Sequence, residues 1–345
     1  MTFDLNAALS RVRERVKAQD PGPNGRPKAL ILTHDNPDPD SLAAAMGLER
    51  LLIREGIAPV IGTGGIIGRA QNRAMVRELG LVLTPFESVE LDTFPLVALV
   101  DTQPGTGNNS LPPSRLPDIV IDHHPPRPLS RQVPWCDIRP DYGASSTIVW
   151  TYLQEAKIDW DPILATAFLY AIKTETRDLG RDAGPLERQA YLELSALSDH
   201  AKLYAITNPK LGREHFVALD RACRMAICWG ELIAVNLGSL PYPDLVAEIA
   251  DLMLAYDKAS WCVCVGEHEG SVYLSIRSDV EDAHAGELIR RVVGSKGAAG
   301  GHGLSAGGRL HGTVREDAEL KQIYDELVAR LVAELRITQP PTPLL

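Results

Sequence analysis

Long apolar runs and long basic runs are both missing from this chain of 345 residues, and each absence excludes a class of protein. No apolar run approaches the roughly 20 residues that span a bilayer, and the N-terminus interleaves charges with apolar residues, unlike a signal peptide. No basic run exceeds two arginines in a chain of formal net charge −10, whereas proteins that follow long nucleic acids need a basic surface. We therefore expect a cytoplasmic protein that binds neither a membrane nor a long nucleic acid.

Paired cysteines are missing too. The five cysteines are odd in number and include no C-x-x-C pair. Cys262 and Cys264 lie in the segment WCVCV, where we expect them on one face of a strand. Small buried side chains explain these residues better than a zinc site or a disulfide does.

The most informative segment that is present is KALILTHDNPDPDSL, residues 28–42. Its apolar run predicts a buried strand, and the Asp-Pro steps that follow cannot continue it. A helix is expected over 41–54, capped by Asp40 or Ser41. His34, Asp38 and Asp40 then share a strand-to-helix turn, where open α/β sheets bind ligands. Two carboxylates and an imidazole with no balancing lysine indicate a metal site.

Two further apolar runs end in similar side chains. The run 95–100 ends at Asp101, and the run 118–121 ends at Asp122, His123 and His124. Because the carboxyl ends of parallel strands meet at one edge of a sheet, these groups should surround a common site. Imidazoles suit a transition metal better than calcium, and the glycine and glutamate of an EF-hand loop are missing.

The order of elements predicts an α/β protein with two domains. Strands near 28–33, 58–61, 95–100 and 118–122 alternate with helices, which is typical of a mostly parallel sheet. After residue 226 the pattern changes to a smaller α/β domain, expected to lie across a cleft from the first. The predicted parts are a catalytic domain over 1–197, a connection over 198–223, a substrate-binding domain over 224–336 and a flexible tail over 337–345.

These motifs resemble the DHH phosphoesterase superfamily. Its Asp-His-His motif corresponds to Asp122, His123 and His124, and its His-x-x-x-Asp-x-Asp spacing to the first motif. IRS at 276–278 and GGHGLSAGG at 300–308 resemble its DHH-associated domain. The resemblance spans residues 28–315 and points to the branch of nanoRNases, pAp phosphatases and cyclic-dinucleotide phosphodiesterases.

The resemblance implies two divalent cations, most simply Mn²⁺, bridged by Asp101. The ligands of the first ion would be His34, Asp38 and Asp101, and those of the second Asp40, Asp101, His123 and an acid from a fourth motif. His124 would face the substrate phosphate, and Asp122 would orient a histidine. The fourth motif departs from the family, because Glu175 stands where an aspartate is usual; Asp178 is the alternative.

On the substrate side, the resemblance assigns the phosphate and base contacts to Arg277, Ser278, Gly300, Gly301, His302 and Gly303. The implied activity is hydrolysis of short oligoribonucleotides, dinucleotides above all, to mononucleotides, with pAp as a second substrate. Alternatives are a cyclic-dinucleotide phosphodiesterase, a family II inorganic pyrophosphatase, or a nucleotide-binding regulator with a weakened metal site. A homodimer is an assembly that the sequence leaves open.

Two other segments invite a functional interpretation. GTGGIIGR at 62–69 lies between a strand and a helix, but Ile67 replaces the last glycine of a dinucleotide-binding fingerprint, so a flexible turn is expected. Arg69 and Asn72 could face the metal site. Ser145 and Ser146 are expected either to cap the helix over 144–156 in contact with solvent or to contact substrate.

Overall fold

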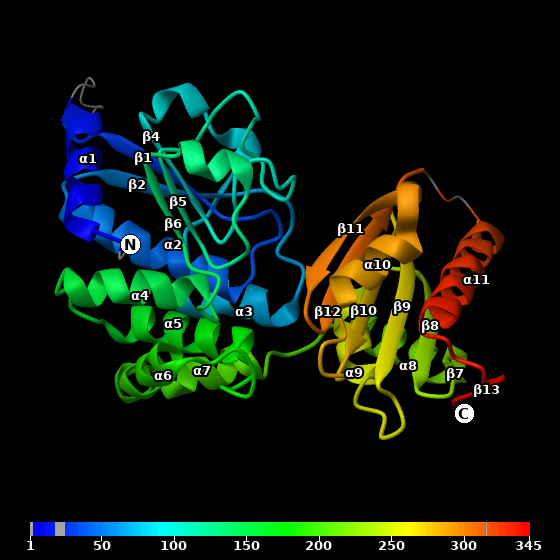
Figure 1. Ribbon diagram of the computed structural model, residues 1–345. Coiled ribbons are helices and arrows are strands. Elements are labelled where there is room, and N and C mark those ends of the chain that lie inside the picture. The colour runs from blue at the N-terminus through cyan, green and yellow to red at the C-terminus, as the bar shows by residue number, and fades with distance from the viewer. Residues whose placement is uncertain (1–2, 18–24, 313, 315) are drawn as a thin grey trace. The chain divides into compact units, whose positions relative to one another are not determined.

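A computed structural model describes residues 3–17, 25–312, 314 and 316–345, apart from the side chain of His302. The chain forms two compact units, Met1–Pro209 and Lys210–Leu345, which we call the first and second units. Each contains a β-sheet packed with helices, so the predicted mixed α/β class is confirmed (Figure 1). No helix among the described residues is both long enough and apolar enough to cross a membrane.

The first unit is built on a six-stranded sheet in the order β3-β2-β1-β4-β5-β6, with every neighbouring pair parallel. Its strands are β1 (Lys28–Leu32), β2 (Ala58–Thr63), β3 (Thr84–Pro85), β4 (Leu96–Val100), β5 (Ile119–Asp122) and β6 (Trp135–Ile138). Its helices are α1 (Leu5–Lys17), α2 (Pro39–Arg54), α3 (Ala70–Leu79), α4 (Ser145–Glu155), α5 (Pro162–Glu175), α6 (Pro185–Leu197) and α7 (His200–Thr207). Short 3₁₀ turns occupy Phe86–Ser88, Leu91–Thr93 and Pro128–Gln132.

The strand order places the candidate site. The chain runs outward from β1 to β3 on one side of the sheet and then returns to β4 on the other side of β1. The order therefore reverses between β1 and β4, and ligands of open α/β sheets bind beyond the carboxyl ends of strands at such a point. His34 follows β1 and Asp101 follows β4.

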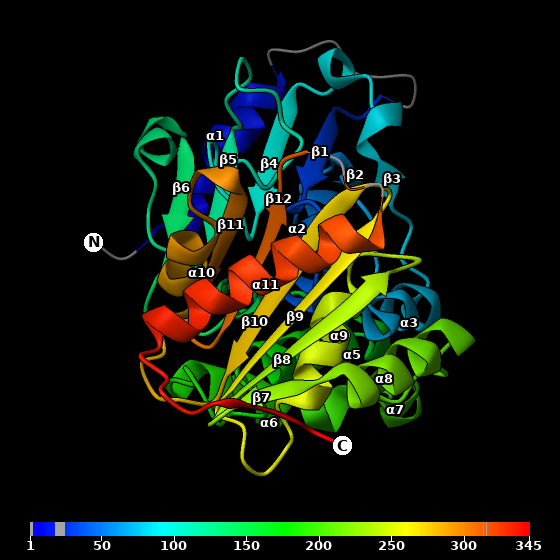
Figure 2. The same ribbon diagram turned by 90° about the vertical axis from the view of Figure 1, so that its right-hand side faces the viewer.

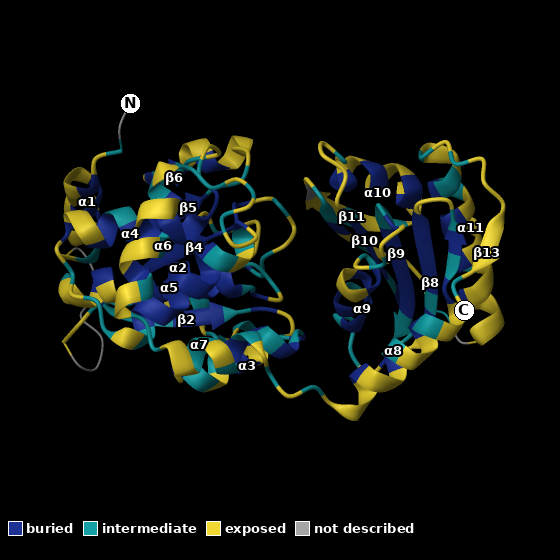
Figure 3. Cartoon of the chain, turned by 90° about the horizontal axis from the view of Figure 1, so that it is seen from below, coloured by how far each residue is buried: buried dark blue, intermediate teal, exposed yellow. Residues whose placement is uncertain are grey.

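Alternation along β1 separates two cores. Ile31 faces the main core with helices α2, α4 and α5, whereas Leu30 and Leu32 face a smaller core on the other side of the sheet. All three side chains are almost completely buried. In Figure 3 the strands β4 and β5 of this unit are dark blue, while its helices show exposed yellow outer faces. Burial on both faces explains why β1 is a continuous apolar run.

The second unit contains a seven-stranded sheet in the order β11-β12-β10-β9-β8-β7-β13, antiparallel except between β8 and β9. Its strands are β7 (Ile227–Trp229), β8 (Leu232–Ser239), β9 (Trp261–His268), β10 (Ser271–Ser278), β11 (Gly297–His302), β12 (Ser305–Leu310) and β13 (Pro341–Pro343). Its helices are α8 (Arg213–Met225), α9 (Leu245–Met253), α10 (Ala285–Val293) and α11 (Asp317–Glu334), with a 3₁₀ turn at Gly294–Lys296. Helices α10 and α11 cover one face (Figure 2), and α8 and α9 cover the other.

Four local features differ from the sequence-based expectation. Helix α2 is capped by Asp38, whose carboxylate accepts a hydrogen bond from the backbone N–H of Ser41, and not by Asp40 or Ser41. The expected connection over 198–223 contains α7 and most of α8. The tail expected to be flexible adds β13 to the sheet edge beside β7. The glycine-rich segment expected as a loop forms the hairpin of β11 and β12.

Candidate metal centre

Side chains from the ends of three parallel strands converge at the carboxyl edge of the first sheet. His34 follows β1, Asp101 follows β4, and His123 and His124 follow β5. Among the described residues, two groups have ligand atoms within 4.8 Å of one another. They are His34, Asp38 and Asp101, and Asp101, His123 and His124. Asp101 belongs to both groups.

Two of the histidines are held so that Nε2 faces the carboxylates. Nδ1 of His34 lies 2.9 Å from the carbonyl oxygen of Asp35, and Nδ1 of His123 lies 3.2 Å from that of Tyr142. A carbonyl oxygen only accepts hydrogen bonds, so each Nδ1 carries a proton and Nε2 is the nitrogen that remains to bind a metal. This backbone contact is typical of metal-binding histidines.

The two oxygens of Asp101 face different histidines. Oδ2 lies 3.6 Å from Nε2 of His34, and Oδ1 lies 3.7 Å from Nε2 of His123. Oδ1 also accepts a hydrogen bond of 2.9 Å from Oγ of Ser145. The side chain is 3% exposed. One buried carboxylate thus lies between two imidazoles, as a bridging ligand would.

Asp40 is fully buried and contacts the start of α4. Its carboxylate accepts hydrogen bonds from the backbone N–H groups of Ser145, at 2.7 Å, and Ser146, at 2.9 Å. Asp40 therefore caps α4 from a distant part of the sequence, and the positive end of that helix dipole stabilises its charge. Both serines are completely buried, so the expected solvent-exposed cap is wrong.

The electrostatics of these groups fit a bound cation. Burial raises the pKa of the Asp101 carboxyl well above its usual value, and the charges of Asp40 and Asp38 raise it further. Burial by itself would lower the pKa of His34, but the charge of Asp38 and the hydrogen bonds of His34 outweigh it and raise this pKa to about 9. The donor set of imidazole nitrogens and carboxylate oxygens matches a divalent transition metal, which would neutralise this repulsion.

Asp122 and His124 form a separate hydrogen-bonded pair beside the centre. Nδ1 of His124 donates to Oδ1 of Asp122 at 2.8 Å, so this nitrogen is not available to a metal, although it lies 3.8 Å from Asp101. Nε2 of Gln103 donates to the other oxygen of Asp122 at 2.6 Å. Gln103 was missed by sequence reasoning, because a lone glutamine in a loop carries no recognisable signal.

The segment that carries these strand ends matches a model of a known protein family. The model of the DHH family, N-terminal domain, matches residues 28–203, about half of the chain. The chain belongs to the DHH family. The predicted resemblance is thereby confirmed, and the DHH segment itself is Asp122, His123 and His124 at the end of β5.

Two proteins from other organisms are similar in sequence to parts of the chain. An uncharacterized protein of Methanocaldococcus jannaschii is 30% identical over 313 residues, which is 89% of this chain and 63% of that protein. A probable manganese-dependent inorganic pyrophosphatase of Deinococcus radiodurans is 33% identical over 152 residues, 42% of this chain and 46% of that protein. This chain thus spans less than two thirds of either relative.

A solved structure shows the same fold over nearly the full chain. The crystal structure of an exopolyphosphatase-related protein from Bacteroides fragilis superposes with a TM-score of 0.71 and 13% sequence identity. The match covers 97% of this chain and all of the other. At that identity the likeness concerns the fold alone.

Two acids near the end of α5 were predicted as alternatives for a fourth metal ligand, Glu175 and Asp178. Glu175 is the last residue of α5. Its side chain is partly buried and interacts electrostatically with the carboxylates of Asp38 and Asp40. Burial raises its pKa well above the usual range, and those two carboxylates raise it further. Asp178 is exposed, and its carboxylate accepts hydrogen bonds from Lys173 and from Tyr191, which lower its pKa.

The glycine-rich turn after β2 supports the first metal motif. The backbone N–H of Asn36 donates to the carbonyl of Gly64 at 3.1 Å, and Oδ1 of Asn36 accepts from the N–H of Ile66 at 2.8 Å. A Cβ at Gly64 would lie 2.0 Å from Oδ1 of Asp35. Glycine is therefore needed for this close approach, and the turn is held by these contacts. On α3, the buried Asn72 donates to the carbonyl of Pro37 at 3.2 Å.

The candidate substrate residues lie in the second unit, around β10 and the β11–β12 hairpin. Arg277 is 8% exposed; its Nε donates to Asp251 and its Nη1 to Oγ of Ser275 at 2.6 Å. Ser278 is completely buried and donates to the carbonyl of Ser260 at 2.9 Å. Arg277 and Ser278 are thus held by neighbours within their unit, and substrate binding by them stays a prediction.

Gly300, Gly301 and Gly303 belong to the hairpin, and the side chain of His302 lies outside the described part of the structure.

Proposed function

We propose that this DHH protein is a phosphoester hydrolase that depends on two divalent cations, most simply Mn²⁺. The observation that carries the proposal is the position of Asp101, whose two oxygens face two different histidines. His34, Asp38 and Asp101 would hold one ion. Asp40, Asp101, His123 and Glu175 would hold the other.

The residues around the centre have separable tasks. When bound, the two cations supply a nucleophilic hydroxide at neutral pH and neutralise negative charge on the phosphoryl group. Asp122 holds Nδ1 of His124, which leaves Nε2 to contact a substrate phosphate. Gln103 holds Asp122 in turn. Asp101 and Asp40 are almost completely buried, so bulk water has little access to their carboxylates.

Short oligoribonucleotides, dinucleotides above all, are the substrates we propose, with mononucleotides as products and pAp as a second substrate. The net charge of −10 and the lack of a basic run support a short substrate over a long one. The glycine-rich hairpin of β11 and β12 supports a nucleotide, because backbone N–H groups without side chains let a ligand approach closely.

Pyrophosphate is a second candidate substrate. The relative from Deinococcus radiodurans, a probable manganese-dependent inorganic pyrophosphatase, favours it by 33% identity over 152 residues. Pyrophosphate hydrolysis would need only the metal centre of the first unit. Nucleotide hydrolysis would also use the second unit, which would hold the substrate.

One panel assay tests the proposal. The purified full chain is incubated with pApA, longer oligomers, pAp, cyclic dinucleotides or pyrophosphate, each with Mn²⁺ and with chelator. We expect fastest turnover of pApA, no turnover with chelator, and a loss of several orders of magnitude in Asp101→Asn. Asparagine tolerates the left-handed backbone of residue 101 (φ 57°), so the variant should keep its fold.

The other outcomes of the assay are equally specific. Fastest turnover of pyrophosphate or of a cyclic dinucleotide would replace the substrate and keep the metal centre. Tight nucleotide binding with no turnover of any substrate would favour a nucleotide-binding regulator. Full activity in a chelated preparation would falsify the metal centre itself.

A further inference from the structure

A cavity lies in the first unit at the opposite edge of the sheet from the candidate metal centre. Its volume is about 530 Å³, and it opens between α1 and the residues that begin β4, β5 and β6. Leu96 begins β4, Asp118 precedes β5, and Trp135 begins β6. The five residues of β4 span roughly 15 Å, so this cavity and Asp101 lie at opposite ends of the same strand.

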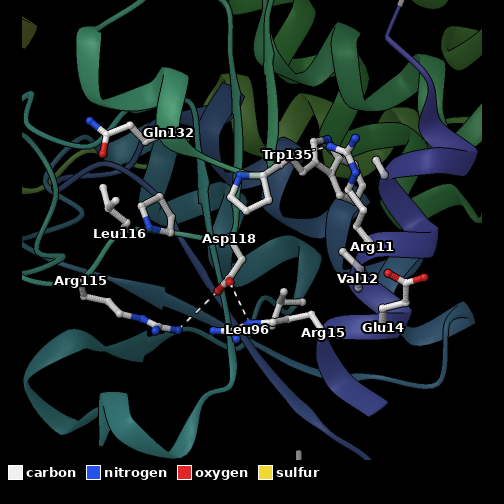
Figure 4. Close-up of a pocket in the computed structure, with 13 residues that line it drawn as sticks. Arg11, Val12, Glu14, Arg15, Leu96, Arg115, Leu116, Asp118, Gln132 and Trp135 are labelled. Carbon is white, nitrogen blue, oxygen red and sulfur yellow. Dashed lines mark hydrogen bonds and ion pairs between the residues drawn. The ribbon is translucent and has the colours of Figure 1, made fainter. Parts of the chain in front are cut away.

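Three arginines line this cavity in an otherwise acidic chain. They are Arg11 and Arg15 of α1 and Arg115 from the segment before β5. Arg15 and Arg115 reach Asp118 from opposite sides (Figure 4), through Nε at 3.2 Å and Nη2 at 3.4 Å. One carboxylate is thus shared by two guanidinium groups and also accepts a hydrogen bond from the backbone N–H of Val97 at 3.0 Å.

The arginines keep hydrogen-bonding capacity for a ligand. Nη1 of Arg11 donates to the carbonyl of Pro134 at 2.9 Å. Among the described residues, each of these three guanidinium groups uses one of its nitrogens in such a contact. A guanidinium carries five N–H donors, so further donors remain on each group. Such forks match the oxygens of a phosphate, and the three arginines outnumber the two carboxylates of the lining, Glu14 and Asp118.

Besides the arginines, Asp118, Glu14 and Gln132, the wall is made of apolar side chains, which suggest the rest of the ligand. Val12, Leu96, Leu116, Pro134 and Trp135 line the cavity beside the arginines. A volume of about 530 Å³ lies within the range of small-molecule sites. An anionic head at the guanidinium groups and an apolar or ring-bearing body against this wall would use both surfaces.

We infer that this cavity binds a small organic phosphate of mononucleotide size, at a site separate from the metal centre. Three guanidinium groups against the carboxylates of Glu14 and Asp118 leave the lining with a net positive charge, and the planar forks match the oxygens of a phosphate. The inference rests on the cavity and its arginines, and it does not depend on the proposed activity.

Calorimetric titration of the full chain tests the inference. The chain carries Asp101→Asn and is kept in chelator, so that binding through metal ions is removed. The probes are AMP, adenosine and inorganic phosphate. We expect AMP to bind and to lose about tenfold to a hundredfold in affinity in Arg15→Ala or Arg115→Ala, because each change removes a charge-assisted hydrogen bond.

Matched variants separate this effect from a general loss of charge or fold. Arg50 is a surface arginine that pairs with Asp161 at 2.7 Å outside the cavity, so Arg50→Ala should leave AMP affinity unchanged. Arg115→Lys keeps the charge but not the fork and should give an intermediate affinity. Circular dichroism checks that each variant is folded.

Three results would overturn the inference. The first is no AMP binding at millimolar concentration, and the second is AMP binding that Arg15→Ala and Arg115→Ala leave unchanged. The third is equal affinity for inorganic phosphate and AMP, because the apolar wall would then contribute nothing and the ligand would be free phosphate.

Discussion

Asp101 combines burial with an uncommon backbone conformation. Its φ of 57° lies in the left-handed region, which costs a residue other than glycine roughly 1–2 kcal/mol. The conformation is held by its N–H, which donates to the carbonyl of Ile121 at 2.9 Å and so ties the end of β4 to β5. Such strain is characteristic of functional sites, and here it turns one carboxylate toward histidines from two strands.

The fourth acid can be assigned by comparing two single substitutions. Glu175→Gln should cost at least a hundredfold in turnover with Mn²⁺, because an amide cannot supply the anionic charge that the second ion needs. Asp178→Asn should change turnover by less than threefold, because Asp178 is exposed and bound to Lys173 and Tyr191. Turnover at saturating substrate and Mn²⁺ content measure the difference; the reverse ranking would move the ligand to Asp178.

Gln103 should act by positioning His124 through Asp122. Gln103→Leu removes the donor at 2.6 Å from Asp122, and a lost hydrogen bond to a charged group is worth about 1.5–3 kcal/mol. We expect kcat on a dinucleotide to fall about tenfold to a hundredfold, with the Michaelis constant and Mn²⁺ content unchanged.

The control for Gln103 is another glutamine bonded to a carboxylate. Gln154 donates to Glu193 at 2.8 Å on the surface, so Gln154→Leu should leave kcat unchanged. A loss of bound Mn²⁺ in Gln103→Leu would instead show that the residue supports the metal ligands.

At the scale of elements, α2 links the metal centre to the core. Its cap, Asp38, also contributes to the metal group, and Asp40 in its first turn caps α4. Its middle packs against α4 and α5 at Gly47, where a Cβ would lie 2.6 Å from Cγ1 of Val149 and 2.5 Å from Cζ of Phe168. The close packing at Gly47 therefore sets how near α2 lies to both helices.

Gly47→Ala should destabilise the protein. The added methyl would overlap side chains that are completely buried, and overpacking costs about 1–3 kcal/mol, more than the gain of roughly 1 kcal/mol in helix propensity. We expect the melting temperature to fall by several degrees, measured by circular dichroism. The same change at Gly300, where nothing lies within 4 Å of the added Cβ, should not lower it. An unchanged melting temperature in Gly47→Ala would mean that the helices can separate at little cost.

At the scale of the whole molecule, the chain divides into two units with separate cores. The core of each unit is made of residues from that unit only. The division falls at Pro209 and Lys210, between α7 and α8. Segments between such cores are the usual sites of proteolytic cleavage.

Limited trypsin digestion should therefore separate the units at Lys210 or Arg213, both of which are exposed. We expect mass spectrometry to find a stable fragment that begins at Leu211 or at Glu214. Replacing both basic residues by glutamine should slow this cleavage and leave other cuts unaffected. A first cut after Lys202, the trypsin site nearest to residue 197, would instead support the boundary predicted from the sequence.

The local sequence by itself determined the long buried strands of the first unit, the helices between them and the order of the motifs. Buried parallel strands such as β1, β4 and β5 are continuous apolar runs, so residues next to one another in the chain carry the signal. The identity of the groups at their ends also followed, because His34, Asp101 and the DHH segment come directly after those runs. The short strands β3 and β6 carry no such run and were missed.

Only the tertiary structure decided which partners these groups have. Asp40 meets the N-terminus of α4 more than 100 residues away, Gln103 meets Asp122, and Arg277 meets Asp251. The tail strand β13 forms because β7 leaves a sheet edge for it. Each of these contacts joins distant parts of the chain, and its energy depends on burial and geometry that arise only when the sheets are assembled. Local propensity therefore carries no trace of them.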